Sequence, residues 1–166
     1  DNSLADLAAI HVLNHQKIPF NIIPFSVGGS DERQYCSPGF NFPVGSLTRS
    51  IYLSYKEYHT SLDNKDFISF SAMLQSIETY FKIIETIEIN KKYTSKIQYC
   101  EPHLGKRGLY PDINTPTFDR NFTHRLLHFL SFADGENDLI EIAEKRKENA
   151  LTYSNIIDLC KEKNII

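Results

Sequence analysis

Apolar residues recur at every third or fourth position in two stretches of the first half of the chain, which is the spacing of one helix face. The first stretch is residues 3–15, where Ser3 stands in position to cap the helix. The second predicts a long helix from about Ser69 to Asn90. Its apolar positions are Phe70, Met73, Leu74, Ile77, Phe81, Ile84 and Ile87. A stripe of this kind predicts a helix face that packs against the protein core.

Two short apolar segments lie between these helices, at residues 20–27 and 42–47, and each has the length and composition of a buried strand. Pro24 makes a central place in a sheet awkward for the first segment. Ser30 follows it and can cap a helical turn over residues 31–35. The order helix, strand, strand, helix predicts an α/β layered domain.

The composition and pattern of the sequence change at Lys91. We therefore divide the chain into two predicted domains, residues 1–92 and 93–166. The second domain is predicted to begin with a short strand at residues 96–99. A loop punctuated by Gly and Pro follows at residues 101–111.

Three short helices are predicted after this loop. The first begins near Phe118 and ends before Gly135. Asn137 or Asp138 can cap the second, and Thr152 can cap the third. Three short helices in this order predict a helix-turn-helix or winged-helix unit.

Charge and cysteine content narrow the classes of function. A net charge of −3 and a pI near 6.1 argue against a dominant nucleic-acid surface. The three cysteines are widely spaced and form no CxxC pair, so we expect no disulfide framework and a reducing cytoplasm as the location. No apolar run is long enough to span a bilayer, so no membrane partner is expected. A homo-oligomer is compatible with the sequence.

His59 is the strongest candidate for a residue that binds a metal or acts as an acid or base. It lies in a loop with the carboxylates Glu57 and Asp63 close by, which are the residue types of a metal or acid–base site. The alternative is a loop histidine bonded to the backbone, and the spacing alone favours that alternative. Asp31, after Gly-Gly-Ser, is either an acid near such a site or a helix-start residue that the helix dipole favours.

Arg33, Lys106 and Arg107 are basic residues that could either bind a ligand or lie at the surface without a role in binding. Arg33 either holds a substrate carboxylate or pairs with Glu32 at the surface. Lys106 and Arg107 stand between two glycines, so they could form an anion-binding loop, although composition favours a solvated turn.

The predicted helical domain shows little sign of reading DNA. The basic run Lys145-Arg146-Lys147 is bracketed by Glu144 and Glu148, which predicts a solvated helix end. Residues 152–163 contain no arginine that could grip guanine.

Four segments, read in order, resemble one bacterial family. They are GSDERQYCSPG (29–39), FPVGSL (42–47), EYHTSLDN (57–64) and EPHLGKRGLYP (101–111). They resemble the aminopeptidase-like proteins of the zinc exopeptidase superfamily, which often carry a C-terminal winged-helix domain and are often described only as a domain of unknown function. The resemblance implies part of a three-layer α/β/α domain followed by a small winged-helix-like domain.

The resemblance also implies roles for individual residues. His59 would be a zinc ligand, and Asp31 would be a catalytic, proton-handling carboxylate beside the metal. The side chains that would line the substrate cleft are Arg33, Tyr58, Lys106 and Arg107. The full-length parent would use zinc-activated water to hydrolyse an amide bond, in a peptide or an amino-sugar conjugate with a free amino terminus.

The sequence departs from that family in one large respect. In the relatives, an earlier His, a bridging Asp, a further carboxylate ligand and a general-base Glu all lie upstream of the helix that opens this chain. No HxD-type pair occurs here, and the chain starts at Asp1 without an initiator Met. We therefore expect an inactive C-terminal portion of a longer enzyme. The alternative is a non-catalytic module in which the winged helix contacts protein or nucleic acid.

Overall fold

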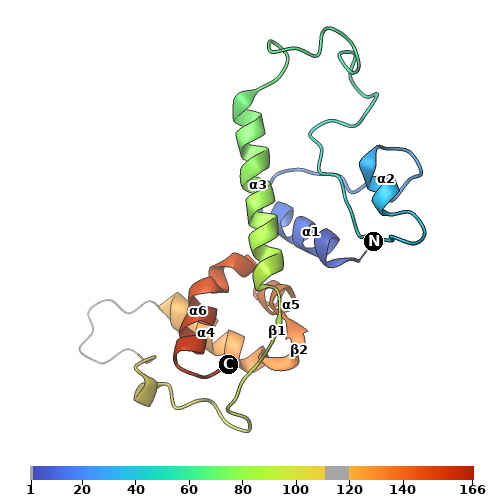
Figure 1. Ribbon diagram of the computed structural model, residues 1–166. Helices are drawn as coiled ribbons and strands as arrows, with labels where there is room; N and C mark the ends of the chain where they lie inside the picture. The colour runs from blue at the N-terminus through green and yellow to red at the C-terminus, as the bar shows by residue number, and fades with distance from the viewer. Residues whose placement is uncertain (1, 111–119) are drawn as a thin grey trace. The chain divides into compact units, whose positions relative to one another are not determined.

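The computed structural model describes residues 2–110 and 120–166, and the chain divides into two compact units, residues 1–87 and 88–166. The helices that begin in the first unit are α1 (Leu4–Gln16), α2 (Asp31–Tyr35) and α3 (Phe70–Ile89) (Figure 1). In chain order the second unit contains β1 (Lys92–Thr94), η1 (Gly105–Arg107), α4 (Arg120–Phe132), β2 (Asp134–Asp138), α5 (Leu139–Glu144), η2 (Ala150–Tyr153) and α6 (Ser154–Glu162). The predicted helix start at Phe118 and the last residue of the predicted 101–111 loop lie outside the described residues.

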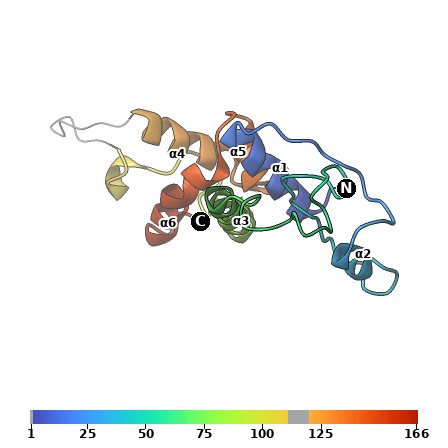
Figure 2. The same cartoon turned by 90° about the horizontal axis from the view of Figure 1, so that it is seen from above.

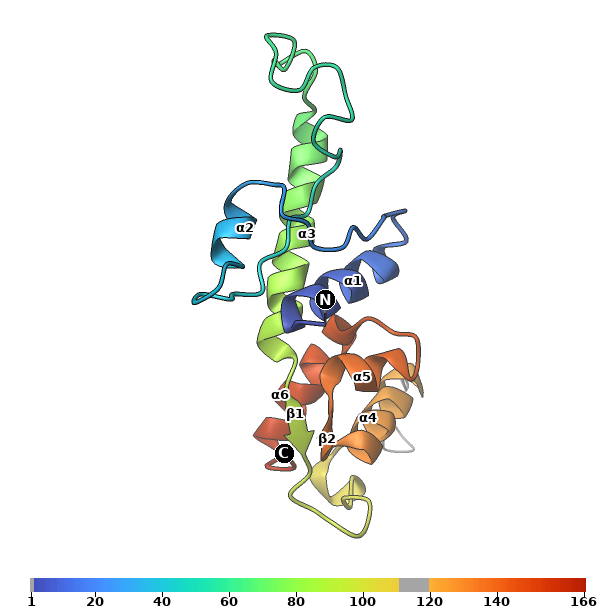
Figure 3. The ribbon, with the colours of Figure 1, turned by 90° about the vertical axis from the view of Figure 1, so that its right-hand side faces the viewer.

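The helix predicted at residues 3–15 is confirmed as α1, and its start is fixed by a reciprocal cap. The Asp6 amide donates to the Ser3 hydroxyl at 3.2 Å, and the Ser3 amide donates to the Asp6 carboxylate at 3.1 Å. Helix α1 crosses α3 (Figures 1 and 3). Where they meet, the Thr79 hydroxyl lies 3.2 Å from Oε1 of Gln16.

The two strands predicted at residues 20–27 and 42–47 are wrong for this chain. Neither segment forms a strand in the described residues. A strand needs a neighbour to satisfy its backbone N–H and C=O groups, and the described part of this unit offers none. Val27 is 85 % exposed as a result. The three-layer sheet that the resemblance implied is therefore not seen in this unit.

The long helix predicted from about Ser69 to Asn90 is confirmed as α3, but its expected packing is wrong. Its apolar stripe was predicted to face a core, and most of it faces solvent. The exposed members are Phe70 (70 %), Met73 (49 %), Leu74 (56 %), Ile77 (49 %), Phe81 (61 %) and Ile84 (53 %). The buried side chains of α3 are instead Thr79, Ile83 and Thr86. The described residues contain no layer that covers the stripe.

Strands β1 and β2 form an antiparallel pair in the second unit, with Lys92 opposite Asp138 and Thr94 opposite Asp134. The predicted strand at residues 96–99 is therefore misplaced, because the pairing begins at Lys92. The Ser95 hydroxyl accepts the amide of Ile97 at 3.2 Å, and this turn ends the strand.

The helices α4, α5 and α6 gather around one core (Figure 2). Its fully buried side chains are Leu126, Phe129, Leu139, Ile142, Ala143, Ala150, Tyr153, Ile156, Cys160 and Ile165. The predicted cap at Asp138 is confirmed, since its side chain accepts the Glu141 amide at 2.9 Å. Thr152 does not cap a helix. It lies inside η2, whose cap is Asn149.

The three cysteines are free. Within the described ranges, no helix is long and apolar enough to cross a membrane.

Candidate functional site

Asp31 and Arg33 lie on α2, a single helical turn after segment 20–27. Both side chains are exposed. The preceding backbone bends sharply at Gly29, where φ is +98° and a Cβ atom would collide with the Glu32 carboxylate. Ser30 does not cap α2 with its hydroxyl. Its amide instead donates to that carboxylate at 3.1 Å.

Arg33 lines a shallow hollow of about 530 Å³ on the first unit. Phe25 and Val27 form its apolar wall, and Cys36 also borders it. A guanidinium group beside an apolar wall suits a ligand with a carboxylate and a nonpolar part. The cleft role of Arg33 stays a prediction that this geometry supports.

His59 lies in a turn that its neighbours shape. The Thr60 hydroxyl donates to the Glu57 carbonyl at 2.9 Å and accepts the Leu62 amide at 3.2 Å. His59 itself has a φ of +56°, a left-handed conformation in which histidine is enriched among residues other than glycine. Its exposed imidazole stacks on the half-buried ring of Tyr58, with 4.1 Å between centroids and 12° between planes. The structure thus brings together two of the predicted site residues.

The residues around His59 do not by themselves fit a zinc ion. A catalytic zinc site takes about three protein ligands and keeps one open position. Within residues 2–110 and 120–166, no set of three His, Cys, Asp or Glu ligand atoms gathers around His59. In the described part of the chain, the imidazole of His59 also makes no hydrogen bond to Asp63. This chain supplies at most one ligand at this position.

Lys106 and Arg107 lie in the second unit, so they belong to a different body from the other predicted site residues. They form the 3-10 turn η1, which the buried Leu104 and Leu109 anchor. The amides of Arg107 and Leu109 donate to the Leu104 carbonyl at 3.1 and 2.9 Å, and the Gly108 amide is also used within the turn. These backbone donors are already occupied, so an anion here would meet mainly the two basic side chains.

A charged cluster in the second unit was not foreseen. The Arg125 Nε donates to Glu148 at 2.8 Å, and the Arg146 Nη2 donates to its other oxygen at 3.0 Å. Burial alone would raise the pKa of Glu148, but the hydrogen bonds and charges of the two arginines outweigh it and lower the pKa from 4.5 to about 2. Lys145 and Lys147 are exposed just after the end of α5, as a solvated helix end predicts, whereas Arg146 and Glu148 belong to this half-buried cluster.

Tyr153 lies against this cluster. Burial, and then the charge of Glu148, raise the pKa of its hydroxyl to about 12. The hydroxyl is fully buried and lacks a hydrogen-bond partner of good geometry among the described residues. Arg125 contacts the ring face, 5.8 Å from its centroid. No sequence signal links these residues, because Arg125 and Glu148 lie 23 positions apart.

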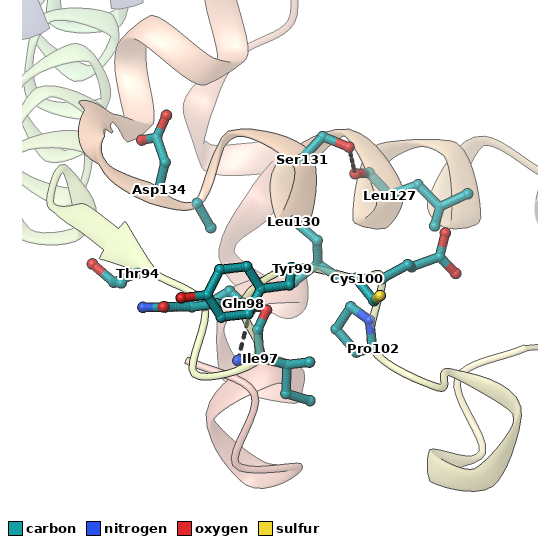
Figure 4. Close-up of a pocket in the computed structure, with 13 residues that line it drawn as sticks. Thr94, Ile97, Gln98, Tyr99, Cys100, Pro102, Leu127, Leu130, Ser131 and Asp134 are labelled. Atoms are coloured by element: carbon teal, nitrogen blue, oxygen red, sulfur yellow. Dashed lines mark hydrogen bonds between the residues drawn. The ribbon is translucent and has the colours of Figure 1, made fainter.

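A pocket of about 590 Å³ lies between the segment that follows β1 and the end of α4 (Figure 4). Tyr99 and Cys100 line one side, and Leu127, Leu130 and Asp134 line the other (Figure 4). The Asp134 carboxylate accepts the amides of the two residues at 136 and 137, and these bonds lower its pKa. Asp134 therefore shapes a turn, and Glu101 is a second carboxylate that lines the pocket.

Two family models match the chain, one for each unit. Residues 1–90 match a family described as a domain of unknown function, DUF4910. The chain belongs to the DUF4910 family. Residues 91–166 match a winged helix-turn-helix. The match confirms the predicted winged-helix unit.

Two proteins that are similar to this chain come from Clostridium acetobutylicum. One is a provisionally named polysaccharide biosynthesis protein with an aminopeptidase-like domain, 41 % identical over 134 residues, which are 81 % of this chain and 31 % of that protein. A solved structure, of a provisionally named peptidase, matches 97 % of this chain and 35 % of that chain, with a TM-score of 0.79 and 34 % identity. The resemblance to aminopeptidase-like proteins is thus confirmed. The chain spans about a third of the length of these relatives.

Proposed function

We propose that this chain is part of a longer, zinc-dependent aminopeptidase-like hydrolase that cleaves an amide bond next to a free amino terminus. The observation that carries the proposal is the similarity of the chain to an aminopeptidase-like protein and to a peptidase structure, each about three times as long. The name of the first relative refers to polysaccharide biosynthesis. That wording favours an amino-sugar or peptide conjugate as the substrate. The described residues supply at most one zinc ligand near His59, so the proposed activity would need the rest of the longer protein.

The chain's own residues would then have limited and distinct tasks. His59 would supply one zinc ligand, with its ring orientation held by the stack on Tyr58. Asp31, exposed at the start of α2, would carry a proton, and Arg33 would bind a substrate carboxylate in its hollow. Lys106 and Arg107 would add positive charge to the substrate cleft. Zinc, once bound, supplies Lewis acidity and makes water a nucleophile at neutral pH.

The test is the replacement His59→Ala in the full-length native protein, with His124→Ala as the matched control. Both imidazoles are exposed, and His124 lies on α4 of the winged-helix unit, away from every predicted site residue in the sequence. Bound zinc is measured by mass spectrometry, and activity is measured on aminoacyl p-nitroanilides and aminoacylated amino sugars.

We expect His59→Ala to lower zinc affinity and activity by at least about a hundredfold, while His124→Ala changes neither. Removal of zinc by a chelator should abolish activity, and added zinc should restore it. Unchanged zinc content and activity in His59→Ala would remove the ligand role, and a zinc-free, inactive wild type would remove the proposed reaction.

The winged-helix match favours a second candidate, a non-catalytic role in which the second unit contacts another macromolecule. The exposed side of α6 carries Asn155, Asp158, Lys161 and Glu162, so its charges nearly cancel. This balance favours a protein partner over nucleic acid. Measured binding to duplex DNA that weakens steeply with added salt would reverse that preference.

A further inference from the structure

His11 and His15 lie four positions apart on α1. At about 100° per residue, positions four apart differ by only about 40° around a helix, so both imidazoles lie on one side of α1. Their ring centroids are 4.5 Å apart, and one ring nitrogen of His11 lies within 4.8 Å of one ring nitrogen of His15. Neither residue has a task in the reaction proposed above.

The distance between the two rings suits a shared metal ion. Imidazole nitrogens bind zinc at about 2.0–2.1 Å, so two of them on one tetrahedral ion lie about 3.4 Å apart. A modest rotation about the side-chain torsions brings the two rings to that separation without a change in the backbone. Two histidines at this spacing on one helix are also the arrangement with which HExxH helices hold zinc.

Helix α1, which carries the pair, is held at both ends. Ser3 and Asp6 form the capping box at its start, and the side chain of Gln16, next to His15, lies 3.2 Å from the Thr79 hydroxyl at its end. The imidazole of His15 is half-buried. A backbone held in this way keeps the two ligands in place before an ion arrives, which lowers the entropy cost of binding.

The sequence between the two histidines indicates what kind of site they form. In HExxH helices, the residue after the first histidine is the glutamate that acts as the general base. Here that position is Val12, which is fully buried. The pair therefore lacks a base of its own, and we expect it to bind an ion without catalysing a reaction.

We infer that His11 and His15 form a binding site for a late transition-metal dication, which is Ni²⁺, Cu²⁺ or Zn²⁺. Imidazole is a ligand that suits these ions, whereas Mg²⁺ and Ca²⁺ prefer oxygen. Water would fill the positions of the ion that no protein atom occupies. The bound ion would join successive turns of α1 and stabilise the folded state. The inference does not rest on the proposed function, because it needs neither zinc at His59 nor hydrolysis.

The test measures how far Ni²⁺ protects His15 from diethyl pyrocarbonate, a reagent that modifies imidazoles that are not bound to a metal. Peptide mass spectrometry follows the modification of His15 over a range of Ni²⁺ concentrations in the full-length native protein. The variant is His11→Gln, and the matched control is Asn14→Ala, at an exposed position of the same helix. His124, exposed on α4, is the internal reference in each digest.

We expect Ni²⁺ to protect His15 in the wild type and in Asn14→Ala, and Mg²⁺ to leave it reactive. In His11→Gln, the Ni²⁺ concentration that gives half protection should rise at least about tenfold, since loss of a group that merely supports a metal ligand already costs that much affinity. His124 should react equally at every Ni²⁺ concentration. An unchanged midpoint in His11→Gln would show adventitious binding to one imidazole and overturn the proposal. So would a His15 that even millimolar Ni²⁺ does not protect.

A second measurement covers the case in which His11→Gln disturbs α1, which circular dichroism would detect, because His11 is only 2 % exposed. In a calorimetric titration with Ni²⁺, His15→Gln should bind one equivalent fewer than the wild type or Asn14→Ala. Equal stoichiometry in the three proteins would overturn the proposal. Neither readout depends on turnover, so failure here is distinguishable from failure of the proposed reaction.

Discussion

Replacement of Glu148 by Gln removes the charge that joins two arginines in the winged-helix unit. A carboxyl group whose pKa falls from 4.5 to about 2 on folding contributes up to about 3 kcal/mol to stability at neutral pH. The side chains of Glu148, Arg125 and Arg146 are 21–29 % exposed, so solvent screens part of this. We expect Glu148→Gln to lower the free energy of unfolding of this unit by about 2 kcal/mol at pH 7.

The effect should depend on pH in a defined direction. The pKa of Glu148 is lower in the folded state than in the unfolded state, so its contribution is complete above about pH 5 and is lost as the pH falls toward 2. Wild type and Glu148→Gln should therefore converge in acid. Urea unfolding followed by methyl NMR signals of Ile142 and Ile156, which lie in the core of this unit, measures the difference at each pH.

Glu162→Gln is the matched control for this experiment. Its ion pair with Lys163 joins adjacent residues, and the Glu162 side chain is 68 % exposed, so the change should cost less than about 0.5 kcal/mol. Equal losses for Glu148→Gln and Glu162→Gln would refute the reasoning. A gap between wild type and Glu148→Gln that is the same at pH 7 and pH 2 would refute it as well.

Two further substitutions test the same unit by urea unfolding. Tyr153→Phe removes a buried hydroxyl that lacks a well-formed hydrogen bond, so stability should be unchanged or higher by up to about 1 kcal/mol, and a clear loss would show that the hydroxyl is bonded. Gly135→Ala should cost about 2 kcal/mol, because φ is +86° and the new Cβ would lie 2.7 Å from the Thr94 hydroxyl. Asn137→Ala, at a position where the side chain only bonds to Asp134, is its control and should cost less than half as much.

The helices could be predicted because their signals are local. Ser3 and Asp6 are three positions apart, as are Asp138 and Glu141, so each capping box is visible in the sequence. The short helix α2 was also predicted, although the Ser30 side chain does not form the cap that was expected. A strand has no comparable local signal, because its pairing depends on a partner strand that the residues of segment 20–27 do not specify.

The candidate site was predictable only in part, for a related reason. The motif around His59 identified the loop, and the turn bonds of Thr60 explain how the loop keeps its shape. The described residues bring no further set of metal-ligand atoms around His59, so the sequence could point to no more than one candidate ligand. The cluster around Glu148 escaped prediction because Arg125 approaches it from a distant helix, and only folding brings the two together.

The amide of Lys96 donates to the carbonyl of Ile165 at 2.7 Å, and its ammonium group reaches the side chain of Asn164 at 2.6 Å. The buried Ile165 therefore joins the first and last segments of the winged-helix unit. During biosynthesis, these contacts cannot form until Ile165 has left the ribosome. Nascent chains stalled before that residue should leave Lys96 without its partners and remain open to chaperones and proteases.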